Sequence, residues 1–78
     1  PEVEVAAEAE TLALIRVVVE AGMASSNSEA RRLVQQGGVK VEGQQVNDIK
    51  AEIDTTASEP LLLQVGKRKH ARIRFKRG

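Results

Sequence analysis

The sequence predicts a small α+β domain in which two N-terminal helices pack on a small antiparallel sheet. Before Gly38, apolar residues recur at the three-and-four spacing of helices, and beyond it they alternate with the period of strands. The length of 78 residues allows one domain with a thin core of mainly small side chains.

The first ten residues, Pro1–Glu10, alternate acids with small residues and contain no turn or helix cap. They are predicted to be an acidic, disordered linker, and a functional acidic arm is the alternative. The folded domain is therefore expected to span residues 11–78.

The first helix is predicted from Thr11, as its N-cap, to about Ala21. Gly22 is expected to end it, since glycine readily adopts the left-handed conformation that follows a helix. Three successive valines lower the helix propensity, so packing is expected to stabilise this segment. Its apolar face is predicted to comprise Ile15, Val18, Val19 and Gly22.

The second helix begins at a predicted capping box, in which the Ser26 hydroxyl accepts the Glu29 amide and the Glu29 carboxylate reaches back. Gly37 and Gly38 are predicted to end the helix. At 100° per residue, two arginines, a hydroxyl and an amide lie opposite the core. The buried stripe is expected to be Ala30, Leu33 and Val34, and the outer face Ser28, Arg31, Arg32 and Gln35.

A hairpin is predicted from Val39–Val41 and Gln44–Val46 around Glu42 and Gly43. Glutamate disfavours a positive φ, so we expect a type I turn with a glycine bulge rather than a type I′ turn. Residues 47–59 are predicted to form a connection. From this connection Ile49 and Ile53 are expected to enter the core.

Residues 61–65 are predicted to form a mostly buried strand. A turn from Gly66 through Lys67, Arg68 and Lys69 is then expected to lead into a final strand at residues 70–76. That strand alternates an apolar face with a wholly basic one, which is typical either of a protected sheet edge or of an RNA-facing strand. The inward residues are Ala71, Ile73 and Phe75, and the outward ones His70, Arg72, Arg74 and Lys76.

The formal net charge of +1 conceals an uneven distribution. Residues 1–30 hold six acids and one base, whereas residues 31–78 hold eleven bases and five acids. The last twelve residues hold seven bases and no acid. This asymmetry predicts a surface that binds a polyanion.

Several classes of protein are excluded by what the chain lacks. Without cysteine there is no disulfide framework or thiolate metal site, and the single His70 makes a metal site improbable. Apolar runs of no more than four residues are too short to span a membrane, and the acidic start does not fit a signal peptide, so a cytoplasmic location is expected. The absence of an initiator methionine is consistent with its removal or with a domain excised from a longer protein.

The single aromatic residue, Phe75, is predicted to face the core. Readers of single strands stack bases on aromatic side chains, so this chain favours structured RNA, recognised through shape, phosphates and 2′-hydroxyls. The helix N-terminus near Ser26–Ser28 adds amide donors for an anion.

Residues 21–41, AGMASSNSEARRLVQQGGVKV, closely resemble the S-four-type RNA-binding motif, and the resemblance extends over about residues 12–46. The family usually has asparagine where this chain has Glu42, which weakens the turn assignment. Residues 61–73, LLLQVGKRKHARI, and residues 25–32, SSNSEARR, are similar to the C-terminal domain of bacterial tyrosyl-tRNA synthetases.

This resemblance implies a tRNA-binding C-terminal module that contacts the anticodon stem and long variable arm of tRNA(Tyr) through phosphates and 2′-hydroxyls. It implies a parent enzyme, a homodimeric tyrosine–tRNA ligase, whose catalytic domain binds ATP and tyrosine. None of that domain's motifs lies here, so no catalytic, cofactor or metal residue is expected in this chain, nor a membrane partner. The isolated domain is expected to be a monomer.

The candidate RNA-binding residues form two groups, one at the second helix and hairpin and one at the basic end of the chain. The same domain in an rRNA-binding protein or a pseudouridine synthase is one alternative. A protein-interaction module with a basic face is another. The candidates are Ser25, Asn27, Ser28, Arg31, Arg32 and Lys40, and then Lys67, Arg68, Lys69, Arg72 and Arg74.

Overall fold

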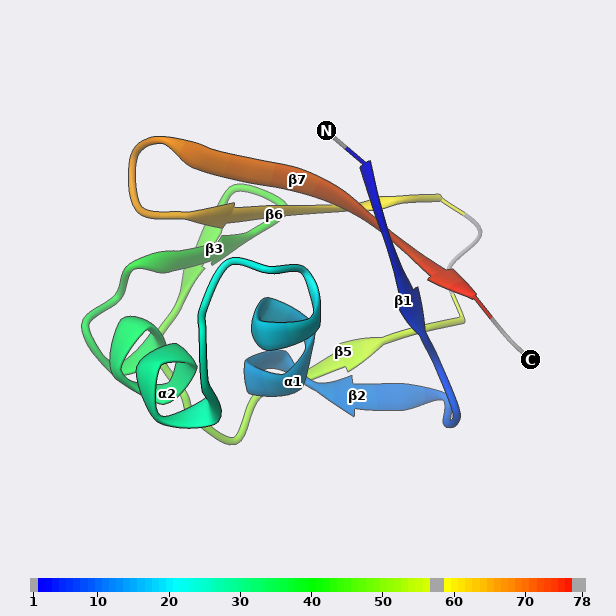
Figure 1. Ribbon diagram of the computed structural model, residues 1–78, viewed down its shortest axis with the longest axis horizontal. Helices are drawn as coiled ribbons and strands as arrows, with labels where there is room; N and C mark the ends of the chain where they lie inside the picture. Colours follow the sequence, from blue (N-terminus) through cyan, green and yellow to red (C-terminus); the bar gives the residue numbers. More distant parts are fainter. Residues whose placement is uncertain (1, 57–58, 77–78) are drawn as a thin grey trace.

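The computed structural model describes residues 2–56 and 59–76, and in them it shows two helices and two sheets (Figure 1). The predicted α+β class is confirmed. The elements are β1 (Glu2–Ala6), β2 (Thr11–Ala13), α1 (Leu14–Glu20), α2 (Asn27–Gln35), β3 (Val39–Val41), β4 (Gln44–Val46), β5 (Glu52–Asp54), β6 (Leu61–Val65) and β7 (Lys69–Lys76).

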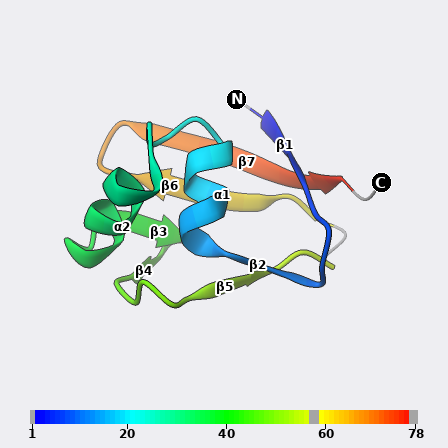
Figure 2. The ribbon, with the colours of Figure 1, turned by 60° about the horizontal axis from the view of Figure 1, so that its bottom comes forward.

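The larger sheet has the strand order β1-β7-β6-β3-β4, and β2 pairs with β5 in a separate two-stranded sheet. Both helices lie against one face of the larger sheet (Figure 2). Its pairs are antiparallel except that β1 runs parallel to β7, so the sheet is mixed rather than antiparallel as predicted.

Strand β1 corrects the prediction that residues 1–10 are a disordered linker outside the fold. Val5 pairs with Phe75 of β7 and is 1% exposed, and the Ala7 amide donates to the Lys76 carbonyl at 2.9 Å. The alternation of acids with small residues is the period of a strand with one buried face. The fold therefore includes this acidic segment from Glu2 onward, while Pro1 lies outside the described residues.

Helix α1 begins later than predicted. Thr11 is not its N-cap but part of β2, where its hydroxyl donates to the Glu52 carboxylate at 3.3 Å. The helix buries Leu14, Val17 and Val18, whereas the expected Ile15 and Val19 are only partly buried. Gly22 follows the helix with φ 76°, as predicted. The Gly22 amide donates to the Val19 carbonyl, and the Met23 amide donates to the Val18 carbonyl. These two hydrogen bonds together form a Schellman motif.

Helix α2 is closer to its prediction. The Ser26 hydroxyl accepts the Glu29 amide at 3.2 Å, but the Glu29 carboxylate accepts from the Ser25 amide and hydroxyl instead of the Ser26 amide. Ala30 and Val34 are fully buried, and Leu33 is only partly buried. The glycine pair ends the helix in a second Schellman motif.

The β3–β4 turn differs from its prediction. Glu42 has φ 53° and Gly43 has φ 81°, so the two-residue loop has the type I′ character that glutamate disfavours. The Glu42 amide donates to the Leu62 carbonyl at 2.9 Å, and the Glu42 carboxylate accepts the Leu62 amide at 3.1 Å. These bonds continue the β3–β6 pairing by one residue and hold Glu42 in the left-handed conformation.

The remaining strands agree with their predictions except for β5, which forms within the predicted connection and brings Ile53 into the core. In β7, Ala71 and Ile73 are buried, Phe75 is partly buried and the four basic positions are exposed, as predicted. Together the helices and the sheet enclose one apolar core. Among the described residues, no helix has the length and apolar character needed to cross a membrane.

Candidate nucleic-acid interface

Helix α2 and the β6–β7 turn lie at the same end of the molecule, away from the chain termini (Figure 1). Each carries exposed basic side chains. We call this set the basic end, and it consists of Arg31, Arg32, Lys67, Arg68 and Lys69.

The helical period determines how Arg31 and Arg32 are presented. Buried Ala30 and Val34 attach α2 to the core, so both arginines face solvent. Successive helical residues are about 100° apart, so the two guanidiniums leave the helix in different directions. Glu29, Leu33 and Gln36 are the α2 residues that border the β6–β7 turn, and by the helical period Arg32 lies nearer to this face than Arg31 does.

The polar candidates at the start of α2 are not equivalent. Both the amide and the hydroxyl of Ser25 donate to the Glu29 carboxylate, at 3.2 and 3.1 Å, so Ser25 is already engaged as a donor. Asn27 and Ser28 are exposed in the first turn and make no side-chain hydrogen bond with the described residues. They are the free polar groups at this helix end.

The β6–β7 turn is tied to the end of α2 through the backbone. The Gly66 amide donates to the Gly38 carbonyl at 2.7 Å, immediately before Lys67, Arg68 and Lys69. This bond fixes the three cations beside the helix, although the two segments are far apart in the sequence.

A groove of about 550 Å³ separates α2 from this turn. Apolar side chains of Met23, Leu33 and Val65 line it, and the cations of the turn border it. No local sequence pattern indicates this groove, because its two walls come from distant segments. The remaining lining residues are Glu29, Gln36, Gly38 and Gly66.

Lys40 lies on the other face of the sheet. Its neighbours Val39 and Val41 face the helices, and its paired residues are Gln45 of β4 and Gln64 of β6. The structure therefore places Lys40 on β3 but does not bring it together with the arginines of α2.

Arg72 and Arg74 lie on that same outer face, beside acids that the prediction placed in a linker. Glu2 pairs with Arg72 and Glu4 with Arg74 in the β1–β7 register, and the Arg74 Nε lies 3.3 Å from Glu2 Oε1. The acids of β1 therefore partly offset the charge of this strand, although they are remote from it in the sequence. Arg72 and Arg74 do not join the basic end.

Ion pairs in the described part of the chain avoid the basic end. Arg16 pairs with Glu8 and Glu20, and Arg74 pairs with Glu2. The acid on the adjoining helix, Glu29, is held by Ser25. No acid among the described residues forms an ion pair with the basic end, and its five cations outnumber the one adjoining carboxylate, that of Glu29, so it presents a net positive charge that attracts polyanions.

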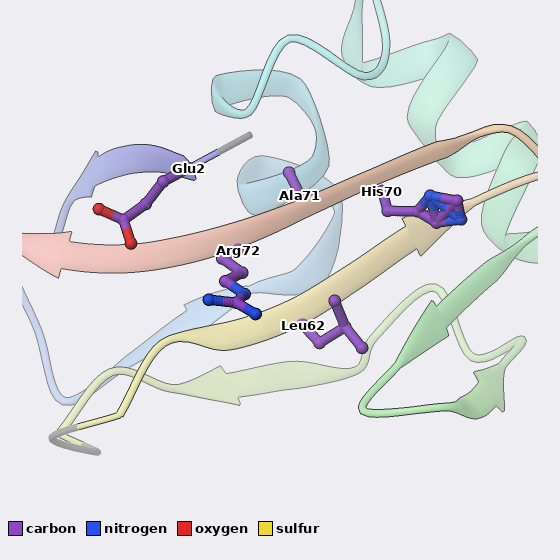
Figure 3. Close-up of a pocket in the computed structure, with 5 residues that line it drawn as sticks. All are labelled: Glu2, Leu62, His70, Ala71 and Arg72. Carbon is purple, nitrogen blue, oxygen red and sulfur yellow. The ribbon is translucent and has the colours of Figure 1, made fainter.

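A second hollow of about 350 Å³ lies on the outer sheet face (Figure 3). Leu62, which is 43% exposed, and Arg72 border it, while Ala71 points toward the helices. Within residues 2–56 and 59–76, no three His, Cys, Asp or Glu side chains are grouped as metal ligands would be.

Comparison with known proteins gives a family match over nearly the whole chain. The model of the tyrosine–tRNA ligase SYY-like C-terminal domain matches residues 1–73. A tyrosine–tRNA ligase of Geobacter sulfurreducens is 49% identical over 96% of this chain, and one of Bdellovibrio bacteriovorus is 41% identical over 94%. A third, of Thermotoga maritima, is 44% identical over 94%. The chain spans only 17–18% of the length of these relatives.

Proposed function

The chain belongs to the family of tyrosine–tRNA ligase C-terminal domains, and from this premise we propose that it is a tRNA-binding module whose contact surface is the basic end. The curated relatives are enzymes, and the match covers less than a fifth of each. We place the binding of ATP and tyrosine, and the dimer contact, in the remainder of such an enzyme. The isolated module is then a monomer that contributes RNA affinity and no catalytic group.

The observation that carries the proposal is the net positive charge of α2 and the β6–β7 turn. Five exposed cations lie on α2, on the β6–β7 turn and at the first residue of β7, and no ion pair among the described residues uses any of them. Each phosphate they neutralise releases counterions, which favours binding at low salt. Asn27 and Ser28 add hydrogen-bond donors at the start of α2, suited to phosphate or 2′-hydroxyl oxygens.

The partner is proposed to be tRNA(Tyr), contacted at the anticodon stem and the long variable arm. Double-helical RNA presents phosphates and 2′-hydroxyls on its shallow minor groove, which suits a surface with cations and short polar donors. The family membership favours this reading over an rRNA-binding protein or a pseudouridine synthase. Lys40, Arg72 and Arg74 are assigned a secondary role, because they lie on the outer sheet face.

The test is a salt titration of binding to a tRNA(Tyr) transcript. Arg32→Gln and Lys67→Gln should each reduce the slope of log affinity against log salt by about 0.7–0.9, the value of one phosphate contact. The matched control is Arg16→Gln, whose side chain pairs with Glu8 and Glu20 outside the basic end. Equal slopes for the wild type, Arg32→Gln and Lys67→Gln would refute the assignment of the surface.

The variable arm is tested separately with a second transcript in which this arm is shortened. Affinity should fall, and the salt slope should decrease as well, because phosphates are removed along with the arm. Identical binding of both transcripts would refute the contact with the variable arm and leave only the contact with the anticodon stem.

A further inference from the structure

We propose that the groove between α2 and the β6–β7 turn takes one unstacked nucleobase of the bound RNA, whose flanking phosphates lie against Lys67 and Lys69. The inference rests on the proposed RNA binding and adds to it a site for a single base. A surface of cations alone would read only the shape of the RNA backbone.

The floor of the groove is apolar and firmly held. Met23 and Val65 are 6% and 5% exposed, and Leu33 of α2 is partly buried beside them. At Gly38 and Gly66 only backbone lines the groove, and the 2.7 Å bond between them joins its two walls. Such a floor can bury the face of a base without first rearranging.

One side chain on the groove wall is suited to the edge of a base. Gln36 is exposed, and its amide makes no side-chain hydrogen bond with the described residues, so it offers both a donor and an acceptor. The acid of the groove, Glu29, is occupied by the Ser25 amide and hydroxyl. Its charge is therefore held at the start of α2.

Charge complementarity selects a nucleotide as the occupant. Lys67, Arg68 and Lys69 border the apolar floor, and none of them forms an ion pair within the described residues. A nucleotide matches both features of the groove, because its flat base can lie on the apolar floor and its phosphates can lie beside the bordering cations. A base within a helix keeps its faces stacked, so only an unpaired one can enter.

The experiment compares three RNAs with the 78-residue chain: a short duplex, the same duplex with one bulged adenosine, and that duplex with an abasic residue at the bulge. The adenosine bulge should bind about tenfold more tightly than the duplex, and the abasic bulge should lose that gain. The abasic RNA keeps the bent backbone and its phosphates, so the comparison isolates the base without changing the protein. Equal affinity for the two bulged RNAs would overturn the inference.

A pair of leucine substitutions locates the base. Leu33→Asn makes the groove floor polar and should abolish the preference for adenosine over the abasic bulge. Leu62→Asn, an identical change on the outer sheet face, should preserve it. Gln36→Ala, at an exposed position, should reduce the preference without involving the core. Loss of the preference in Leu62→Asn but not in Leu33→Asn or Gln36→Ala would place the base elsewhere and overturn the inference.

The result also separates this inference from the proposed function. If all three RNAs bind equally and Arg32→Gln lowers their salt slope, RNA binding stands and the base site is wrong. If none of the RNAs nor the tRNA(Tyr) transcript binds, both fail. If an acidic leucine-containing peptide bound the groove and none of the RNAs did, both proposals would likewise be overturned.

Discussion

The Glu2 carboxylate lies 3.3 Å from Arg74 Nε, across the parallel pairing of β1 with β7. This contact places the acidic start of the chain on the same surface as the basic final strand. Both side chains are more than half exposed, so the pair contributes little to stability. Its consequence is electrostatic, because the acids of β1 reduce the positive potential of the outer sheet face.

Removing the acids of β1 should therefore strengthen RNA binding. We expect Glu2→Gln combined with Glu4→Gln to raise tRNA affinity about twofold to fivefold at low salt. No gain is expected near 1 M salt, because charges more than about 3 Å apart are then screened from each other. The matched control is Glu8→Gln, since Glu8 pairs with Arg16 instead. Unchanged affinity at low salt would show that RNA does not sense the outer sheet face.

The burial of Val5 gives a stability test of β1. Val5→Ala should lower the free energy of unfolding by about 1–3 kcal/mol, because Val5 is 1% exposed and packs within the core. Val3→Ala, at a partly buried position on the same strand, should cost less. Denaturant unfolding followed by circular dichroism measures both. Equal stability of Val5→Ala and the wild type would indicate a free linker instead.

Two adjacent leucines of β6 should differ sharply on truncation. Leu63 is fully buried and Leu62 is 43% exposed, because neighbouring strand residues point to opposite faces. Leu63→Ala should destabilise by about 2–5 kcal/mol, and Leu62→Ala by less than about 1 kcal/mol. Thermal melts measure both changes. Similar losses of stability in the two variants would contradict the assignment of Leu63 to the buried face of β6 and of Leu62 to the exposed face.

The two helix-ending glycines form another matched pair. Both have a positive φ, which costs an alanine about 1–2 kcal/mol, and a Cβ at Gly22 would meet open space. At Gly37 a Cβ would collide with the Gln45 amide, which donates to the Gly37 carbonyl at 2.9 Å. Gly37→Ala should therefore destabilise more than Gly22→Ala.

A double-mutant cycle isolates that collision. Gln45→Ala alone removes one exposed hydrogen bond, worth about 0.5–1.5 kcal/mol. Combined with Gly37→Ala, it should cost less than the sum of the two single changes, because the collision is removed. Additive costs in denaturant unfolding would mean that Gln45 moves aside freely.

Local signals were sufficient for α2 and for the glycines that end both helices. The Ser26 cap and the Gly37 stop act within a few residues, so their types alone predict the ends of α2. The helical period also predicted the exposure of Arg31 and Arg32, because it places them on the face opposite the buried Ala30 and Val34.

Non-local pairing explains the errors. The start of α1 was misplaced because Thr11 pairs with Asp54 of β5, and the β3–β4 turn was misassigned because Glu42 bonds Leu62. In each case a distant strand satisfies backbone groups that the local sequence leaves open. Local propensity has no access to such partners.

The sequence by itself determined the α+β class, the faces of α2 and β7, and the family resemblance that the comparisons confirmed. Only the tertiary structure decided where the charges meet. Folding sets Glu2 against Arg74 and places Lys67 beside α2, so one basic group is compensated and the other is left available. The physical reason is that electrostatic interaction depends on distance in space, which the pairing of remote strands determines.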